Sequence, residues 1–194
     1  RATPISKASP PPPFCREAEP ALYPPRAPES AHKVGGGPNG VDTGYFAPAL
    51  RHDDPSEPAR PAIVFTGAMD YWPNVDAVKW FAENVFPQVR RARPEARFYI
   101  VGGKPAAAVR ALANETVLVT GRVDDVRPYL QHATAAGAPM RIARGIQNKV
   151  LEGMAMQKSV IVSPQGLEGI DANPGIEVLL AEGAEEFARL TLEA

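Results

Sequence analysis

The sequence predicts an α/β fold in which a parallel β-sheet is flanked by helices. From Pro61 onward, short runs rich in β-branched and aromatic residues alternate with stretches whose apolar residues recur every three or four positions. This alternation is typical of βαβ units. Before that point the composition differs, because 13 of the 22 prolines fall in residues 1–60 and no regular apolar period is found there. The folded domain is therefore expected to begin near residue 61.

The first βαβ unit opens with an apolar run at residues 62–67, which ends in Gly67. A helix is expected over residues 75–91, since its valines and phenylalanine lie three or four positions apart and form one buried face. Pro94 follows and cannot continue a helix, so the chain is expected to leave the helical conformation before it.

The remaining elements follow the same alternation. Strands are expected at residues 97–101, 116–120, 133–138, 160–162 and 176–180, and helices at 105–113, 124–132, 145–156 and 184–192. The strand at 133–138 is poorer in β-branched residues than a central parallel strand should be. About six strands thus alternate with helices, and such a sheet binds ligands at the C-terminal ends of its strands.

Composition excludes several classes of function. The formal net charge is −1 and charges of both signs are mixed through the chain, so no basic stripe indicates a nucleic-acid partner. Three scattered histidines have no metal-ligand spacing, and no metal or cofactor is expected. The single cysteine, Cys15, excludes an internal disulfide and favours a reducing compartment. No apolar run reaches the roughly 20 residues that span a bilayer, which favours a cytoplasmic location.

The chain divides into three predicted regions. Residues 1–37 are expected to be irregular, either as a proline-rich tail or as the remnant of a preceding domain. Residues 38–60 are expected to form a linker, and residues 61–194 a single Rossmann-like domain.

The most informative segment follows the fourth strand and is expected to open a helix at Gly145. The N-terminus of a helix presents backbone N–H groups and a partial positive charge. The amides near Gly145, Ile146 and Gln147 are therefore expected to hold a diphosphate, with Arg144 and Lys149 adding charge. Beyond these lies Glu152, one turn after Asn148, where a carboxylate can accept hydrogen bonds from the two hydroxyls of a ribose. Spacing alone does not separate this interpretation from a solvated helix surface.

The segment from Gly145 to Met156, with the strand after it, resembles the donor-site helix of retaining glycosyltransferases of the family 4 type. The sugar transferases associated with the PEP-CTERM/exosortase exopolysaccharide system are the most similar. Three further stretches agree in order with this resemblance: residues 38–43, 65–70 and 119–123. The resemblance implies a GT-B architecture, in which two Rossmann-like domains face each other across a cleft, and this chain is similar to the C-terminal, donor-binding half.

The resemblance also implies roles for residues. Glu152 matches the second of two glutamates eight positions apart and is expected to hold the nucleotide ribose. Arg144 stands where the first glutamate is expected, so a donor-sugar contact is absent there or is made by a cation. Gly67 belongs to the phosphate loop after the first strand, which lacks the family's arginine and lysine. The base pocket is expected at Gly121, Arg122 and Val123.

The function that the resemblance implies is transfer of a sugar from a nucleoside-diphosphate sugar to a glycan or lipid-linked acceptor, with retention, in cell-surface polysaccharide synthesis. The catalytic residues toward the acceptor are expected in a second domain, so this fragment alone is expected to be inactive. Peripheral association with the inner face of the membrane through that domain is left open. Two alternatives also stay open: a nucleotide-sugar epimerase of the same architecture, and a non-catalytic nucleotide-binding module.

Four other features have weaker interpretations. Trp72 and Trp80 can each stack on a sugar or a base, but Trp80 sits within a helical pattern and is interpreted as packing. His132 is interpreted as a helix-end cap. The pair Gly102 and Gly103 is interpreted as a turn.

Overall fold

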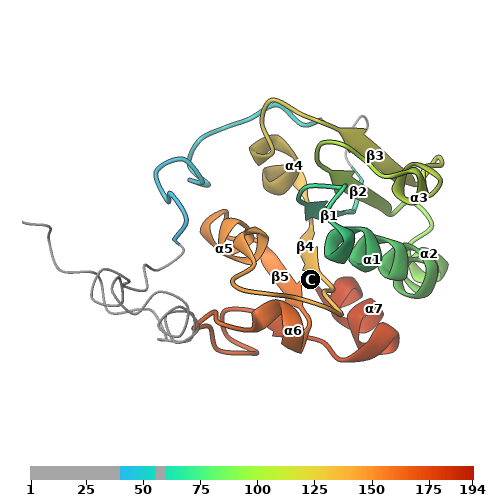
Figure 1. The fold of residues 1–194 in the computed structure, drawn as a ribbon. Helices are drawn as coiled ribbons and strands as arrows, with labels where there is room; N and C mark the ends of the chain where they lie inside the picture. The colour runs from blue at the N-terminus through green and yellow to red at the C-terminus, as the bar shows by residue number, and fades with distance from the viewer. Residues whose placement is uncertain (1–39, 56–59) are drawn as a thin grey trace, which may run out of the picture. The chain divides into compact units, whose positions relative to one another are not determined.

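The computed structural model describes residues 40–55 and 60–194. Its sheet has six parallel strands in the order β3-β2-β1-β4-β5-β6, which confirms the predicted α/β class (Figure 1). The strands are β1 Ala62–Thr66, β2 Arg97–Val101, β3 Val117–Gly121, β4 Ala135–Ala138, β5 Ser159–Val162 and β6 Leu179–Leu180. This order reverses direction between β1 and β4, as in dinucleotide-binding folds.

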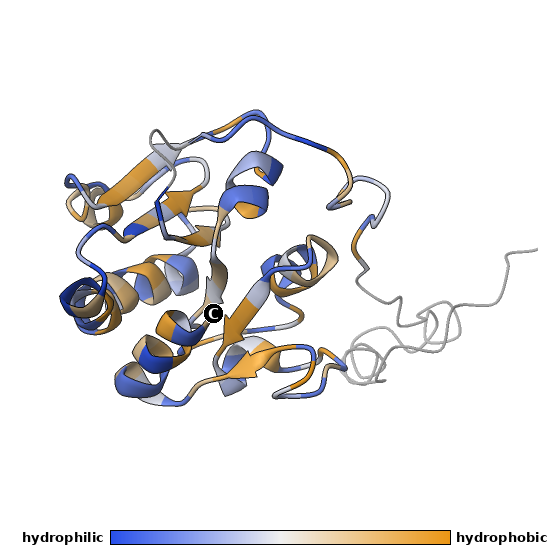
Figure 2. Ribbon diagram, turned by 180° about the vertical axis from the view of Figure 1, so that it is seen from behind, coloured by the Kyte–Doolittle hydropathy of each residue, from blue (hydrophilic) through white to orange (hydrophobic). Residues whose placement is uncertain are grey.

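Helices cover both faces of the sheet. Their bounds are α1 Trp72–Trp80, a π-helical turn η3 Phe81–Val85, α2 Phe86–Ala92, α3 Ala107–Arg110, α4 Arg127–His132, α5 Asn148–Ala155, α6 Pro164–Leu167 and α7 Gly183–Glu193. Successive strand residues point to opposite faces, so Phe65 packs with the side chains of α1, α2 and α7, while Val64 packs with those of α4 and α5. Figure 2 shows the apolar residues on the strands and on the helix sides that face them.

The central strand β4 consists of three alanines and one glycine, and the close approach of helix α5 explains this unusual composition. Helix α5 lies very close to it: a Cβ added at Gly153 would stand 3.3 Å from the Cβ of Ala136 and 2.8 Å from a methyl group of Val160. Larger side chains on β4 would push α5 away from the sheet. The strand is therefore central despite its few β-branched residues, because here small side chains decide how near the helix comes.

Several predicted boundaries are wrong. The helix expected from Gly145 begins at Asn148, with Gln147 as its extended N-cap residue. The strand expected at 176–180 is reduced to Leu179–Leu180, since residues 173–178 form a turn that leaves Ile176 84% exposed. The short helix α6 was not predicted.

Residues 40–55, from the predicted linker, run along α4. The Gln131 side chain accepts a hydrogen bond from the backbone N–H of His52 (2.7 Å) and donates one to the carbonyl of Leu50 (2.6 Å). The guanidinium of Arg127 lies 3.8 Å above the ring of Tyr45. His132 ends α4 and its Nε2 lies 2.8 Å from the carbonyl oxygen of His52. The prediction for residues 1–37 lies outside the described residues.

Among the helices of the described segments, none has the length and apolarity needed to cross a membrane.

Candidate functional site

A cleft of about 730 Å³ opens at the C-terminal ends of β1 to β4. It therefore includes the point between β1 and β4 where the strand order reverses, which is where sheets of this type bind their ligands. The lining residues come from the ends of β1 and β2, from the loops that follow the four strands, and from the N-terminal parts of α1 and α5. They are Thr66, Gly67, Ala68, Asp70, Tyr71, Asn74, Val101, Gly102, Gly103, Lys104, Arg122, Val123, Val126, Arg144, Ile146, Gln147, Asn148, Lys149 and Glu152.

The floor of the cleft is built from backbone at the ends of β1 and β2. Gly67 and Gly102 have φ of +154° and +156°, values that side chains disfavour, and a Cβ at Gly102 would stand 1.7 Å from the carbonyl oxygen of Gly67. The Gly67 N–H donates to the carbonyl of Val101 at 3.1 Å, and the Met69 N–H donates to that of Gly103 at 3.0 Å. The pair Gly102 and Gly103 is thus a close approach of two loops at the cleft, which is more than the turn predicted.

Lys149, in the first turn of α5, is the most perturbed cation of the cleft. Its Nζ donates to Asn74 Oδ1 at 3.1 Å and to Gln147 Oε1 at 3.2 Å, and lies 4.9 Å from the centre of the Phe65 ring. Burial lowers the pKa of this ammonium to about 8, and the Glu152 carboxylate opposes the shift. The ammonium thus has neutral oxygen partners and no carboxylate within salt-bridge distance in the described structure, which leaves its charge available to an anion.

Glu152 lies almost one turn further along α5, beside the end of β1. Its Oε2 accepts a hydrogen bond from the hydroxyl of Thr66 at 3.4 Å. Burial raises the pKa of the Glu152 carboxyl above its usual value, while the Thr66 hydrogen bond and the charge of Lys149 act in the opposite direction. A carboxylate with one long hydrogen bond keeps acceptor capacity for hydroxyl groups of a ligand.

Two contributors were missed by the sequence reasoning. Asn74 is only 5% exposed; it donates to the carbonyl of Ala68 at 3.0 Å and accepts from Lys149, so it ties the loop after β1 to α5. Thr66 orients Glu152. Neither residue could be identified as part of the site from its type, because asparagine near a helix start and threonine in a strand are common in any α/β protein.

The cleft carries an excess of positive charge. Four cationic side chains and two carboxylates line it: Lys104, Arg122, Arg144 and Lys149, with Asp70 and Glu152. Lys104 lies 3.8 Å from Asp70, so these two offset each other. The excess of cations favours an anionic ligand.

The structure brings most of the predicted site residues together. Nine line the cleft: Gly67, Arg122, Val123, Arg144, Ile146, Gln147, Asn148, Lys149 and Glu152. The other two, Gly121 and Gly145, are adjacent in sequence to lining residues, and the carbonyl of Gly121 accepts a hydrogen bond from the Gly102 N–H at 3.2 Å. Because the helix begins at Asn148, the amides of Gly145, Ile146 and Gln147 belong to the preceding loop, which corrects the predicted geometry.

Within the described residues, no group of three or more His, Cys, Asp or Glu side chains has an arrangement that could hold a metal ion.

Residues 60–194 match the family model described as "Glycosyl transferases group 1". No curated protein sequence matches the chain.

Solved structures share the fold at low sequence identity. A glycosyltransferase from Rickettsia africae is 19% identical over 78% of this chain and 44% of its own, with a TM-score of 0.59. Anabaena Alr3699/HepE, solved in complex with UDP and glucose, is 14% identical over 86% of this chain and 50% of its own, with a TM-score of 0.61. The chain thus spans about half the length of these two proteins. It covers 91% of the C-terminal domain of a group 1 glycosyl transferase from Francisella tularensis, at 15% identity and a TM-score of 0.57.

Proposed function

The chain belongs to the group 1 glycosyl transferases, and on that basis we propose that the cleft binds the nucleoside diphosphate of a sugar donor. Its Rossmann-like fold is that of GT-B glycosyltransferases. The donor is the ligand whose chemistry fits the cleft: two anionic phosphates, a ribose with two hydroxyls, and a flat base.

The observation that carries this proposal is the pairing of Lys149 and Glu152 above a floor of bare backbone. Because Gly67 and Gly102 have no side chains, a diphosphate can approach the strand ends closely; bulky side chains there would prevent this. The Lys149 ammonium is held over this floor by Asn74 and Gln147, both neutral, so its charge is left for phosphate. Glu152, half-buried nearby, offers its oxygens to the ribose hydroxyls.

The helix start adds to the charge of Lys149. Helix α5 begins at Asn148, and the partial positive charge of its N-terminus lies within the cleft lining. A solved relative of similar fold was obtained with UDP and glucose, which supports a uridine or related nucleotide as the class of ligand to test first.

The reaction proposed for the whole enzyme is sugar transfer to a glycan or lipid-linked acceptor, with retention, in exopolysaccharide synthesis. The bond between the anomeric carbon and the terminal phosphate oxygen breaks, a bond to the acceptor oxygen forms, and the acceptor hydroxyl loses its proton. Negative charge grows on the departing diphosphate, where Lys149, Arg144 and the start of α5 stabilise it. The groups that receive the acceptor are proposed to come from a second domain.

One observation favours a second candidate, a nucleotide-binding module without transferase activity. Arg144 lines the cleft at the position where the resemblance implies a glutamate toward the donor sugar. A cation there changes or removes that contact, and binding of nucleotide without transfer is the consequence to be tested.

The test is a panel of nucleoside diphosphates added to the full chain while its melting temperature is followed. A ligand that binds only the folded state adds about 2.7 kcal/mol of stability at a hundredfold excess over its Kd. We expect at least one nucleoside diphosphate to raise the melting temperature and its nucleoside monophosphate to raise it less. No shift with any of them contradicts the proposal.

Radiolabelled nucleotide sugars with membrane lipids then separate the candidates when the whole enzyme is used. Labelled lipid or glycan indicates transfer, and an altered sugar on the nucleotide indicates epimerisation. Bound but unchanged donor indicates the non-catalytic module.

A further inference from the structure

A second cavity, of about 300 Å³, lies at the C-terminal ends of β4, β5 and β6, beside α1 and α7. The loop after β4 lines both hollows: Pro139, Met140 and Arg141 line this cavity, and Arg144, Ile146 and Gln147 line the donor cleft. The proposed donor function uses none of the cavity's residues. Its volume is at the lower end of the range of small-molecule sites, roughly 300–1,000 Å³.

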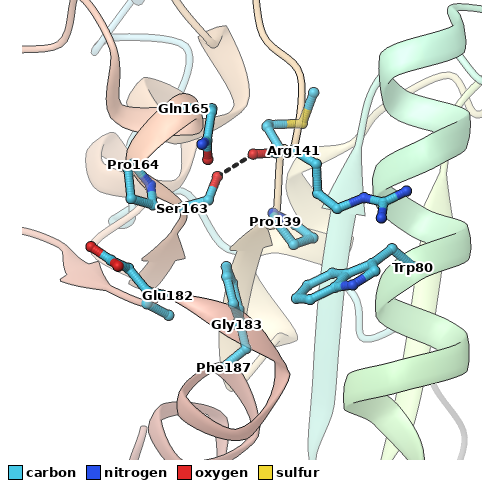
Figure 3. Close-up of a pocket in the computed structure, with 11 residues that line it drawn as sticks. Trp80, Pro139, Arg141, Ser163, Pro164, Gln165, Glu182, Gly183 and Phe187 are labelled. Carbon is cyan, nitrogen blue, oxygen red and sulfur yellow. Dashed lines mark hydrogen bonds between the residues drawn. The ribbon is translucent and has the colours of Figure 1, made fainter.

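One wall of the cavity is aromatic. Trp80 makes an edge contact with Phe187, with ring centres 5.7 Å apart and planes at 79°. Figure 3 shows the indole of Trp80 below the Arg141 side chain, with Pro139 beside it. The prediction that Trp80 packs is confirmed, since it lies against the buried core, yet it also lines this cavity.

Two planar polar side chains, those of Arg141 and Gln165, also line the cavity. Figure 3 shows Gln165 on the side of the cavity opposite Arg141, and the Gln165 side chain is exposed. The hydroxyl of Ser163 already donates to the carbonyl of Met140 at 2.6 Å and accepts from the Gly166 N–H at 3.1 Å, so it belongs to the frame. An aromatic wall in a cavity that is also lined by an amide, a guanidinium and the carboxylate of Glu182 is suited to a pyranose, which has both C–H faces and hydroxyl edges.

The polar and aromatic pattern continues along α1 toward the donor cleft. Trp72, Asp76 and Trp80 are four residues apart and lie on one side of the helix, so the two indoles are separated by about 12 Å of helix rise. Arg141 from the loop after β4 is bound to Asp76, which stands midway between the two tryptophans in the helix, and the Arg141 Nε lies 2.9 Å from Asp76 Oδ2. Trp72 is 57% exposed, and its neighbour Tyr71 lines the donor cleft.

We propose that Trp72, the Arg141 and Asp76 pair, and the cavity of Trp80 and Gln165 form a track that binds an oligosaccharide, distinct from the donor cleft. Indole rings alternate along the track with charged or amide groups. The C–H faces of a sugar chain can stack on the indoles, and its hydroxyls can form hydrogen bonds with the polar groups. An alkyl chain would instead be stabilised by an unbroken apolar groove, and the half-exposed Arg141 interrupts this one. Interpreting the bound oligosaccharide as the acceptor rests on the proposed function; the binding itself does not.

The experiment titrates the full chain with cellotriose, maltotriose, mannotriose and chitotriose, and follows tryptophan fluorescence and saturation-transfer NMR. We expect at least one trisaccharide to bind. Trp72→Ala and Gln165→Ala change exposed side chains and are therefore expected to fold, and each is expected to weaken that binding at least fivefold. Ile176→Ala, an exposed apolar residue on the turn before β6 and outside the track, is the matched control and is expected to change nothing.

Two further arms separate this proposal from the donor proposal. Glu152→Ala is expected to lose nucleotide binding and to retain trisaccharide binding, and saturating nucleoside diphosphate is expected not to displace the trisaccharide. With octyl glucoside, NMR contacts are expected at the sugar ring.

Several results would overturn the track: no trisaccharide binding, full affinity in both track variants, displacement by the nucleotide, or octyl glucoside contacts confined to the alkyl chain. Failure of the nucleotide panel with intact trisaccharide binding would instead count against the donor proposal alone.

Discussion

The loop after β1 and the loop after β4 line the same cleft, but they are held in different ways. Residues 67–71 are fixed by backbone hydrogen bonds to the loop after β2, and by the contact between Gly67 and Gly102. Residues 139–147 are anchored largely through side chains: Arg141 to Asp76, and Ser163 to the carbonyl of Met140.

One loop therefore sets the shape of the cleft, and the other supplies its charged side chains. The backbone-held loop has no room for new side chains and sets the shape of the floor. The loop after β4 leads into α5 and, with that helix, supplies Arg144, Lys149 and Glu152, whose substitution alters charge with little steric cost. Changes in the first region should therefore act mainly on folding. Changes of an exposed charge in the second, such as Arg144, should act mainly on ligand binding, whereas the largely buried Lys149 should affect both.

The largest effect is expected for Gly102→Ala. The new methyl group would overlap the carbonyl oxygen of Gly67, and the backbone would stay in a disfavoured conformation. Strain and overpacking of this kind each cost about 1–3 kcal/mol, so we expect a loss of about 3 kcal/mol or more in the free energy of unfolding. Chemical denaturation measures it. Gly40→Ala is the control, because nothing lies within 4 Å of its added Cβ; equal stability of the two variants would show that the two loops do not meet so closely.

The next effect is a pH dependence due to Lys149. Its pKa is 10.5 in the unfolded chain and about 8 in the folded domain, so between these values the unfolded state binds more protons. The free energy of unfolding that Lys149 contributes therefore rises as pH increases from about 8 to 10.5, by at most about 3 kcal/mol. The measurement is the difference in unfolding free energy between wild type and Lys149→Met across this range.

Ligand binding should act on the same group. A diphosphate next to Lys149 favours the charged ammonium, so nucleotide binding at pH 8.5 is expected to take up a fraction of a proton. Calorimetry in buffers of different ionisation enthalpy detects this uptake, which Lys149→Met should lack. A pH-independent difference in stability between wild type and Lys149→Met would mean that the ammonium is fully solvated.

The smallest effect is expected for Arg144→Gln. The side chain is exposed and lines the cleft, so its attraction for a phosphate is screened by water and salt. We expect roughly a two- to fivefold loss of nucleotide affinity that shrinks at high salt, with unchanged stability. Arg91→Gln, an exposed arginine on α2 away from the cleft, should change neither. An increase in affinity on removing Arg144 would exclude a phosphate contact.

The sequence predicted the sheet better than the boundaries of the site. Alternating apolar runs are local, and they indicated all six strands and the buried face of the helix predicted at residues 75–91. The start of α5 was misplaced because Gly145, Ile146 and Gln147 were predicted as its first residues, whereas Gly145 has a φ of +70° and Gln147 is extended, so neither is helical.

The site residues that the sequence did not reveal were missed for a different reason. Asn74 acts through Lys149, which is 75 positions away in the chain, and no local pattern reports such a pair. Likewise, Gly102 was interpreted from its neighbour Gly103, although its role depends on the distant Gly67. Residues whose function is a contact between two loops are visible only once the loops are placed.

The most direct test of the account is titration of Glu152 variants with ribo- and 2′-deoxyribonucleoside diphosphates by calorimetry, after each variant is shown to fold. Glu152→Gln keeps the shape and one acceptor oxygen, and is expected to bind the ribonucleotide about tenfold more weakly, equivalent to about 1.4 kcal/mol. Glu152→Ala should lose more affinity and nearly all preference for the ribonucleotide over the deoxyribonucleotide, whereas Glu168→Gln, an exposed glutamate outside the cleft, should behave as wild type. Equal affinities for both nucleotides in wild type and in Glu152→Ala would contradict the assignment of this carboxylate to the ribose.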